Sequence, residues 1–361
     1  MAHSPSAPKL VHVTTAESPQ WRPDEFLDGF QALTIDLGTD PDGEGAIDAT
    51  LVRAPGAGSE PDRHGAVLYV HGFTDYFFQT ELADFFTDAG YDFYALDLRK
   101  CGRSLREGQQ PHFTTDLVQY DRELNAALDV VAAASRDAGT PTRVLVVAHS
   151  TGGLITPLWI DRLRRTDPAR HRLLTGLVLN SPWLDLQGEA LLRTDAARLL
   201  VAGIGRFAPK RVIPRELSSA YGESLSAHAH GEWAYDLHRK PLTGFPVTFG
   251  WMAAVRAGQL RLHRGLEVGV PALVLRSDKS RFVGAYRPEV DTADCVLDVR
   301  QIAQWSGVLG SRVWAVAVPD ARHDVFLSLA TPRRIAYDEV RTWMTTVFDE
   351  APAVGEGAQQ Q

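Results

Sequence analysis

The chain has 361 residues, of which 44% are hydrophobic and 23% are charged, a composition typical of a globular protein with a sizeable core. Its formal net charge of −8 argues against a general nucleic-acid binder, because phosphate recognition requires concentrated positive charge. No uninterrupted apolar run is long enough to span a membrane, and the first residues lack the charged start and apolar stretch of a signal peptide, so we expect a cytoplasmic protein.

Strand and helix patterns alternate along most of the chain. Strands are predicted, in chain order, at Leu33–Leu37, Ala46–Arg53, Ala66–Val70, Tyr91–Leu98, Val144–Val147, Leu177–Leu179, Ala272–Leu275 and Val313–Val318. Helices are predicted at Thr80–Ala89, Asp116–Ala134, Leu154–Arg165, Val296–Leu309 and Pro332–Phe348. Near-continuous apolar strands separated by helices indicate a mostly parallel sheet with helices on both faces. Right-handed crossovers would bring the loops after the strands to one edge of that sheet.

The middle and the two ends of the chain depart from this alternation. Residues 185–267 carry scattered helical fragments, turn residues and several aromatic side chains, which predicts a cap, or lid, inserted into the sheet domain. The sheet domain is then discontinuous, with residues 21–184 and 268–350 forming one α/β core. Residues 1–20 and 351–361 are predicted to be weakly structured tails.

The segment Ala148-His149-Ser150-Thr151-Gly152 has the pattern of a nucleophile elbow, a sharp turn between a strand and a helix that exposes a serine hydroxyl. A predicted strand precedes this segment and a predicted helix follows it. Serine in such a turn has a strained backbone, so the residues two before and two after it must be small. Ala148 and Gly152 satisfy this demand, although glycine is the usual residue at the first position. The alternative is a turn of the same composition without chemistry.

A serine hydroxyl is a poor nucleophile at neutral pH and needs a base, which in turn needs an orienting carboxylate. The base is expected in the loop after the last strand, where His323 lies. The acid is expected after the preceding strand, where the candidates are Asp278, Asp291, Asp294 and Asp298. Spacing leaves two of them open: Asp278 is close to the strand end, and Asp294 lies directly before a predicted helix.

Acyl transfer also generates an oxyanion, which needs two preorganised backbone donors. One is expected from the amide of Thr151, directly after the serine. The other is expected from the amide of Phe73, in the loop His71-Gly72-Phe73-Thr74 that follows a predicted strand. Glycine allows this loop to turn sharply, and His71 is predicted to brace it instead of acting as an acid or base.

The remaining motifs are assigned no chemistry. The turn Asp97–Ser104 is predicted to hold loop geometry on the same edge of the sheet. The histidines at positions 228, 230 and 238 lack the cysteine or His-Glu-x-x-His context of a metal site, so neither a metal nor a cofactor is expected. Two cysteines, Cys101 and Cys295, are too few for a disulfide framework, and the sequence leaves open whether they are close together.

These motifs resemble α/β-hydrolases of the monoglyceride lipase and lysophospholipase type, a group often placed with serine aminopeptidase-like hydrolases. The matching pieces are His71-Gly72, the turn Asp97–Ser104, the elbow around Ser150, Leu179–Trp183, and the acid and histidine loops. The resemblance covers roughly residues 25–350, with the cap its weakest part. Besides Ala148, a second departure is Lys100-Cys101, where the family usually has Gly-His.

The resemblance decides between the candidate acids. In that family a small residue and an aspartate precede a short apolar turn and a helix, and Thr292–Asp298 matches this pattern. The acid role is therefore carried to Asp294, and Asp278–Asp291 is then an insertion relative to the family.

The resemblance thus implies an α/β-hydrolase fold and a serine hydrolase that cleaves a carboxylic ester. Ser150, His323 and Asp294 would form the triad, with the amides of Phe73 and Thr151 as the oxyanion hole. The aromatic cap suggests a small-molecule ester with an apolar acyl or aryl group. Alternatives are an amide, peptide or thioester substrate, acyl transfer to an alcohol, and a catalytically silent fold that binds a ligand.

Overall fold

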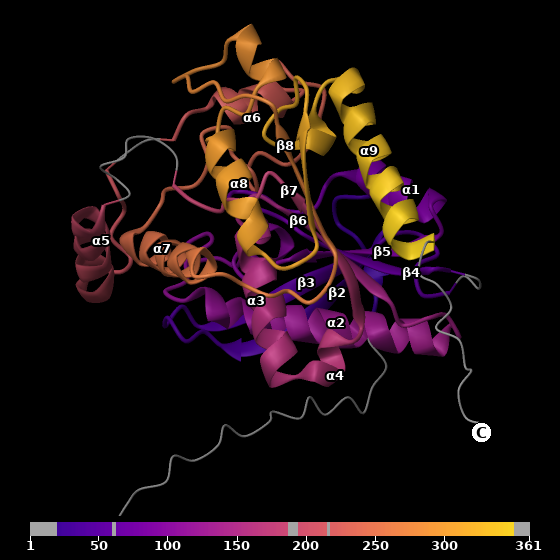
Figure 1. Ribbon diagram of the computed structural model, residues 1–361. Coiled ribbons are helices and arrows are strands. Elements are labelled where there is room, and N and C mark those ends of the chain that lie inside the picture. The colour runs from indigo at the N-terminus through magenta and orange to yellow at the C-terminus, as the bar shows by residue number, and fades with distance from the viewer. Residues whose placement is uncertain (1–19, 60–62, 187–193, 215–216, 350–361) are drawn as a thin grey trace, which may run out of the picture.

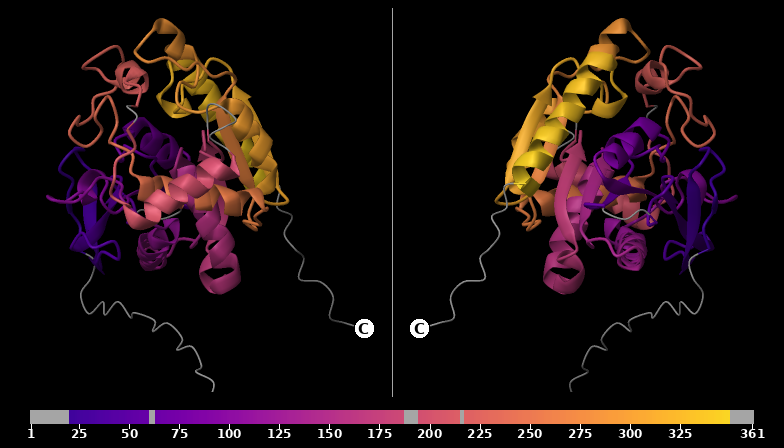
Figure 2. Two further views of the ribbon diagram at one scale, coloured as in Figure 1. Left: turned by 90° about the vertical axis from the view of Figure 1, so that its left-hand side faces the viewer. Right: turned by 90° about the vertical axis from the view of Figure 1, so that its right-hand side faces the viewer.

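The computed structural model describes residues 20–59, 63–186, 194–214 and 217–349. The expected tails, residues 1–20 and 351–361, lie outside these ranges except for Gln20. Within the described residues the strands form one sheet with helices on both faces (Figure 1 and Figure 2).

The sheet has nine strands in the described part of the chain, in the order β1-β2-β3-β5-β4-β6-β7-β8-β9. Their bounds are β1 Arg22–Pro23, β2 Gln31–Thr39, β3 Ala46–Arg53, β4 Gly65–Val70, β5 Tyr91–Asp97, β6 Val144–His149, β7 Leu174–Asn180, β8 Ala272–Ser277 and β9 Val313–Val318. The first three strands pair antiparallel, and β3 pairs antiparallel with β5. All other pairs, from β5 to β9 across the sheet, are parallel. The predicted mostly parallel sheet is confirmed.

The central strands are buried on both faces, which explains their unbroken apolar sequences. Every residue of β4 and of β6 is buried. Alternate side chains of these strands enter two separate cores, one shared with α2, α3 and α8 and the other with α1 and α9. The sheet therefore lies between two helical layers, and its carboxyl-terminal edge is left to the loops.

The helices in the described residues largely follow the predicted pattern. Their bounds are α1 Thr80–Asp88, α2 Asp121–Asp137, α3 Gly152–Thr166, α4 Pro168–His171, α5 Asp195–Phe207, α6 Ala220–Leu225, α7 Phe249–His263, α8 Val299–Trp305 and α9 Ala330–Met344. The helix predicted over Val296–Leu309 is too long. The amides of Val296 and Leu297 donate to the Asp294 side chain instead (2.8 and 2.7 Å), and Asp298 then caps the N-terminus of α8.

A long segment, residues 181–271, separates β7 from β8 and contains α5, α6 and α7. We call this segment the insertion. Helices α5 and α7 lie side by side at one edge of the molecule (Figure 1), whereas α6 contacts the short helical segment Pro288–Thr292. The interruption of the strand–helix rhythm therefore corresponds to a real interruption between two adjacent parallel strands.

The two cysteines are not bonded to each other. Cys101 and Cys295 are both free and buried. Burial raises the pKa of the Cys101 thiol, and it raises that of Cys295 to about 12, so both are protonated at neutral pH. Among the described residues, no helix combines the length and the apolar character that crossing a bilayer requires.

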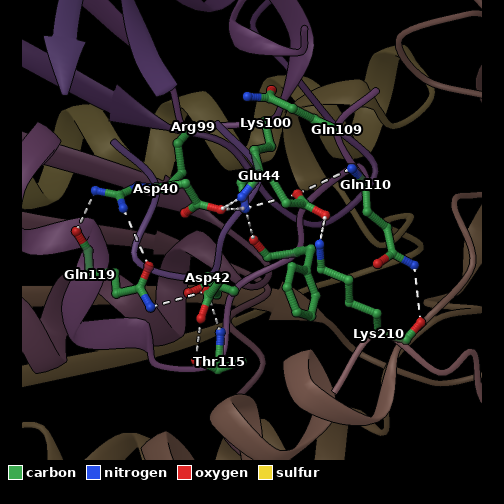
Figure 3. Close-up of polar contacts among 12 residues, drawn as sticks. Asp40, Asp42, Glu44, Arg99, Lys100, Gln109, Gln110, Thr115, Gln119 and Lys210 are labelled. Carbon is green, nitrogen blue, oxygen red and sulfur yellow. Dashed lines mark hydrogen bonds and ion pairs between the residues drawn. The ribbon is translucent and has the colours of Figure 1, made fainter. Parts of the chain in front are cut away.

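Lys100 is a buried cation in the turn after β5. Its φ is 59°, a left-handed conformation that residues with a Cβ rarely adopt, and its side chain is fully buried. The ammonium contacts Asp40 Oδ2 (2.7 Å), Glu44 Oε2 (3.0 Å) and the carbonyl oxygen of Phe113 (3.0 Å) (Figure 3). This contact ties the turn between β2 and β3 to the edge of the sheet where the candidate site lies.

The charge of Lys100 keeps its main partner ionised. Burial by itself would raise the pKa of Asp40, but the hydrogen bond and charge of Lys100 outweigh burial, and the pKa lies below its ordinary value of 3.8. Because the folded-state pKa is the lower one, this contribution to stability is present above pH 3.8 and is lost as the pH falls below that value.

The substitution Lys100→Met is expected to lower the free energy of unfolding at pH 7 by about 3–5 kcal/mol, because Asp40 would keep a buried charge without a counter-ion. Urea denaturation measures the change, and the gap to the wild type should narrow below pH 4, where Asp40 becomes protonated. As a control, Arg341→Met removes an exposed ion pair with Asp338 and should change the stability by less than about 1 kcal/mol. Equal effects of the two substitutions would contradict the assigned role of Lys100.

Candidate active site

Ser150 lies in the sharp turn between β6 and α3, as the sequence predicts. Its φ is 51°, in the left-handed region, which is strained for a residue other than glycine. Hydrogen bonds on both sides hold this backbone in place. The Ser150 amide donates to the Asn180 carbonyl (3.0 Å), and the Trp183 amide donates to the Ser150 carbonyl (2.9 Å). The turn is therefore fixed by residues at the end of β7 and at the start of the insertion.

Two glycines allow the chain to pass close to this turn. A Cβ on Gly152 would lie 2.5 Å from the His71 carbonyl oxygen, and one on Gly72 would lie 2.9 Å from Ser150 Cβ. Neither position has room for a larger residue. The requirement for a small residue two positions after Ser150 is confirmed, and Ala148 is accommodated as a fully buried residue of β6.

Three side chains that are distant in sequence form a continuous hydrogen-bonded chain. His323, in the loop after β9, places Nε2 3.0 Å from Ser150 Oγ and Nδ1 2.9 Å from Asp294 Oδ2. Because a carboxylate only accepts, Nδ1 carries the proton toward Asp294, and Nε2 is left to accept from the serine hydroxyl. The exposed fractions are 8% for Ser150, 2% for His323 and 0% for Asp294, so bulk water competes little for these bonds.

The Asp294 carboxylate is oriented by its own loop. Its second oxygen, Oδ1, accepts the amides of Val296 (2.8 Å) and Leu297 (2.7 Å). The backbone of Asp294 also pairs with the segment after β8, where its amide donates to the Lys279 carbonyl (3.0 Å). These bonds leave Oδ2 directed at the imidazole, so the loop and not only the side chain sets the geometry.

The other three aspartates considered for the acid have different partners. Asp278 is partly exposed and accepts the amide of Asp320 (3.0 Å). Asp291 accepts the guanidinium of Arg322 (2.6 Å), and Asp298 caps α8. The structure therefore brings only one of the four predicted candidates into hydrogen-bond contact with the imidazole.

The loop after β4, Gly72–Asp75, runs beside Ser150, and we call it the oxyanion loop. His71 braces its start, because Nδ1 donates to the Gly72 carbonyl (2.7 Å) while Nε2 accepts the amide of Leu98 (3.1 Å). The bracing role predicted for His71 is confirmed. Among the described residues, the amides of Phe73 and Thr151 have no hydrogen-bond partner.

The turn Asp97–Ser104 is structural, as predicted. Asp97 is fully buried, and its carboxylate accepts the amides of Phe77 (2.9 Å) and Arg103 (3.0 Å). The Arg103 guanidinium bonds the same carboxylate (2.9 Å) and also pairs with Asp24. These contacts hold the turn against the chain that follows the oxyanion loop.

Sequence reasoning missed a second buried polar group beside the candidate site. Asp75 Oδ1 lies 2.7 Å from Nζ of Lys240, and Asp75 Oδ2 lies 3.3 Å from Nδ1 of His149. The His149 ring in turn lies 4.9 Å from the His323 ring, measured between centroids. The sequence position of Asp75, directly after the loop that contains Gly72, could have indicated that it lies beside the site. No sequence pattern indicates Lys240, because its place beside the loop depends on how the insertion folds back.

A small cavity lies beside the loop that follows β4. A cavity of about 10 Å³, lined by residues that include Gly72, Phe73, Thr151 and Trp251, adjoins the oxyanion loop. This volume holds about one water molecule. Among the described residues, no group of three or more histidine, cysteine, aspartate or glutamate side chains is arranged to hold a metal ion.

Solved structures of low sequence identity share this architecture. A soluble variant of monoglyceride lipase from Saccharomyces cerevisiae, in complex with a substrate analogue, is 15% identical, with 94% of this chain and 97% of that chain covered and a TM-score of 0.59. A monoacylglycerol lipase from Paleococcus ferrophilus is 16% identical over 80% of this chain and 96% of its own, with a TM-score of 0.56. A putative hydrolase from Agrobacterium vitis is also 16% identical, with 87% of this chain and 98% of that chain covered and a TM-score of 0.56. The predicted α/β-hydrolase fold is confirmed.

No sequence relative of this chain was found among curated proteins. The family described as serine aminopeptidase, S33, matches residues 61–293, which is more than half of the chain. The match includes the oxyanion loop and Ser150 and ends directly before Asp294. Asp294 and His323 are therefore assigned from their contacts in the structure and not from the family match. On the extent of this match and on its fold, the chain belongs to the serine aminopeptidase (S33) family of α/β-hydrolases.

Proposed function

We propose that this hydrolase cleaves carboxylic esters through an acyl-enzyme, with Ser150 as nucleophile, His323 as general base and acid, and Asp294 as the orienting carboxylate. The observation that carries the proposal is the unbroken relay from Asp294 through His323 to Ser150, with donor–acceptor distances of 2.9 and 3.0 Å. Such a relay activates a serine hydroxyl that is otherwise a weak nucleophile.

The proposed reaction has two similar halves. Ser150 Oγ attacks the carbonyl carbon while His323 Nε2 takes the hydroxyl proton, and the carbonyl π electrons move onto oxygen. The tetrahedral intermediate collapses to an acyl-serine, and the departing alkoxide takes the proton from His323 and leaves as the alcohol. Water then attacks the acyl carbon while His323 Nε2 takes its proton, and a second tetrahedral intermediate forms. This intermediate collapses to the carboxylic acid as Ser150 Oγ leaves and takes the proton back from His323.

The amides of Phe73 and Thr151 are proposed to stabilise the oxyanion. Both belong to segments that flank Ser150, and neither amide has another acceptor among the described residues. Donors that are preorganised in a buried site stabilise the charge that develops in the transition state. The close packing of Gly72 against Ser150 supports this assignment, because it keeps the two segments together.

Residues 185–267 are proposed to act as a cap that must move to admit a substrate. The burial of Ser150 and His323 supports this, because an ester must reach both side chains. The ring of Phe73 contacts Trp251 at a centroid distance of 4.2 Å, and Trp251 contacts Trp183 at 5.6 Å. These aromatic side chains favour an apolar acyl or aryl group, as a small-molecule ester would supply.

The family description raises a second candidate, the hydrolysis of peptides from their amino terminus. A free α-ammonium group would need an unpaired anionic partner in the site. Among the described residues, three buried carboxylates near Ser150 already have partners: Asp294 bonds His323, Asp75 pairs with Lys240, and Asp324 accepts from Asn180. We therefore favour the ester over the aminoacyl amide.

The Ser150→Ala variant should lose turnover of p-nitrophenyl butyrate by a factor on the order of 10⁶ and should no longer react with a fluorophosphonate probe, because the nucleophile is absent. Initial rates and probe labelling measure the two effects. Ser181→Ala, which changes a neighbouring buried serine outside the relay, serves as the control and should keep most of the activity. Undiminished turnover in Ser150→Ala would refute the proposal, and failure of the wild type to react with the probe would indicate a catalytically silent fold.

Asp294→Asn should lower kcat by about 10⁴ because the amide cannot hold the required imidazole tautomer. Asp278→Asn is the matched control, since the same chemical change falls on an aspartate without a contact to His323, and kcat should stay near the wild-type value. Steady-state kinetics on one ester substrate compare the two variants. A reversed order of the two losses would move the acid role to Asp278.

The wild type should hydrolyse p-nitrophenyl butyrate and release no measurable p-nitroaniline from alanine p-nitroanilide, because the three carboxylates near Ser150 in the described part of the chain are already paired. Both products are followed by absorbance under the same conditions, and an ethyl thioester provides a third comparison. Faster release from the anilide than from the ester would reverse the assignment in favour of an aminopeptidase.

A further inference from the structure

The oxyanion loop has a strained backbone that other parts of the chain must hold in place. Thr74 has a φ of 51°, and a β-branched residue in the left-handed region is an energetic outlier. Such strain persists only where the surroundings over-determine the conformation, and it is common at sites that need a preorganised backbone. The question is which contacts hold Thr74 and the amide of Phe73 before it.

Among the described residues, two of the three polar contacts to Thr74 come from the insertion. The Phe245 amide donates to Thr74 Oγ1 (2.9 Å), and Lys240 Nζ lies 3.4 Å from the Thr74 carbonyl oxygen. The ring of Phe73 packs on Trp251. The rest of the protein contributes one hydrogen bond to Thr74, from its amide to His112 Nε2 (3.0 Å). The insertion therefore contacts the carbonyl oxygen and the hydroxyl of Thr74 and the ring of Phe73.

Lys240 also makes the strongest of these contacts. Its ammonium lies 2.7 Å from Asp75 Oδ1, with both side chains buried. Three aromatic rings surround the ammonium at 5.5–5.9 Å from their centroids, namely Phe78, Tyr221 and Tyr235. A buried ion pair contributes little net stability compared with apolar packing, because both charges lose their hydration. The ion pair does restrict the geometry, because a displaced partner would leave a buried charge unpaired.

The same ion pair connects the insertion to the nucleophile turn. Asp75 Oδ2 lies 3.3 Å from Nδ1 of His149, the residue directly before Ser150. Burial alone would raise the pKa of Asp75, but Lys240 and His149 outweigh it and hold the pKa far below the ordinary value. Asp75 is therefore anionic at any pH at which an esterase would be assayed, and its two oxygens join Lys240 on one side to the elbow on the other.

We propose that Lys240 is a positioning residue that fixes the oxyanion loop, so that the Phe73 amide is directed at the reacting oxygen only while the insertion is docked. The proposal rests on the proposed esterase function and adds the insertion to the core residues that hold the loop, His71 and His112. Since the oxyanion exists in the transition state and not in the bound ester, loss of Lys240 should lower kcat and leave KM nearly unchanged.

The test compares two lysines of the insertion that both pair with core carboxylates. Lys240→Met removes the contact with Asp75, whereas Lys210→Met removes an ion pair with Glu44 (2.9 Å), which lies in the turn between β2 and β3 and not in the oxyanion loop (Figure 3). With p-nitrophenyl butyrate we expect Lys240→Met to lower kcat by about 10²-fold at a KM within about twofold of the wild type, the scale of losing one oxyanion donor. Lys210→Met should keep the wild-type kcat, and Lys240→Arg should recover most of the lost rate.

A second readout separates positioning from general damage to the fold. An alkyl trifluoromethyl ketone accepts Ser150 Oγ at its carbonyl carbon, the π electrons move onto oxygen, and the serine proton passes to His323, so the adduct carries an oxyanion. The inhibition constant of this ketone should rise in Lys240→Met by about the same factor by which kcat falls. Fluorophosphonate labelling of the same variant should show that Ser150 is still accessible.

If Lys240→Met does not fold, Thr74→Val and Thr74→Ser provide the same comparison, because valine keeps the shape but removes the hydroxyl that accepts the Phe245 amide. We expect a lower kcat for valine and near-wild-type kcat for serine. Equal kcat for Lys240→Met and Lys210→Met, a rise in KM alone, or equal behaviour of the two Thr74 variants would overturn the inference. A wild type without esterase activity or probe labelling would instead overturn the proposed function.

Discussion

The structure of the site depends on the close approach of two backbone segments, the loop after β4 and the turn after β6. Gly72 and Gly152 permit this approach, since a Cβ at either position would lie within 3 Å of its neighbours. The parallel pairing of β4 with β6 in the sheet brings the two segments to the same edge. Contact between them places Ser150 beside the amides of Phe73 and Thr151. The chemistry that we propose depends first on this approach of the two backbone segments, and only then on the side chains that they carry.

Two buried lysines illustrate how the surrounding charges are used. Lys100 joins the turn between β2 and β3 to the edge of the sheet, and Lys240 joins the insertion to the oxyanion loop. In both cases an ammonium with almost no exposure meets a buried carboxylate. Ion pairs of this kind add less stability than their Coulomb energy suggests, because desolvation offsets the attraction. They do restrict the geometry, since a displaced partner would leave a buried charge unpaired.

The family relationship and the individual contacts carry different information. Structures with 15–16% identity share the architecture with this chain, which shows that many sequences can form the same covered sheet. Lys240 lies in the insertion, which connects two adjacent parallel strands. The sheet does not constrain the length of this connection. The insertion is therefore a part of this fold where a family can change the surroundings of the site without changing the sheet.

The sequence by itself indicated most strands of the sheet and the helices between them, and it predicted that Ser150, His323, Phe73 and Thr151 follow strands at one edge of that sheet. Apolar strands and small residues around a turn depend on neighbours in the chain, and the loops after parallel strands must meet at one edge. Spacing could not choose between Asp278 and Asp294, and the resemblance to a family was needed to favour the second. The structure supports that choice through the amides of its own loop, which orient Asp294 toward the imidazole.

Only the tertiary structure decided the length of α8 and the pairing of Asp75 with Lys240. The predicted helix over Val296–Leu309 was too long because a side chain took the amides of its first turn, a competition that helical periodicity does not register. Lys240 and Asp75 are 165 residues apart in the chain, and their contact depends on how the insertion folds back over the strands. Contacts between distant segments follow from the packing of the whole chain, which no local pattern encodes.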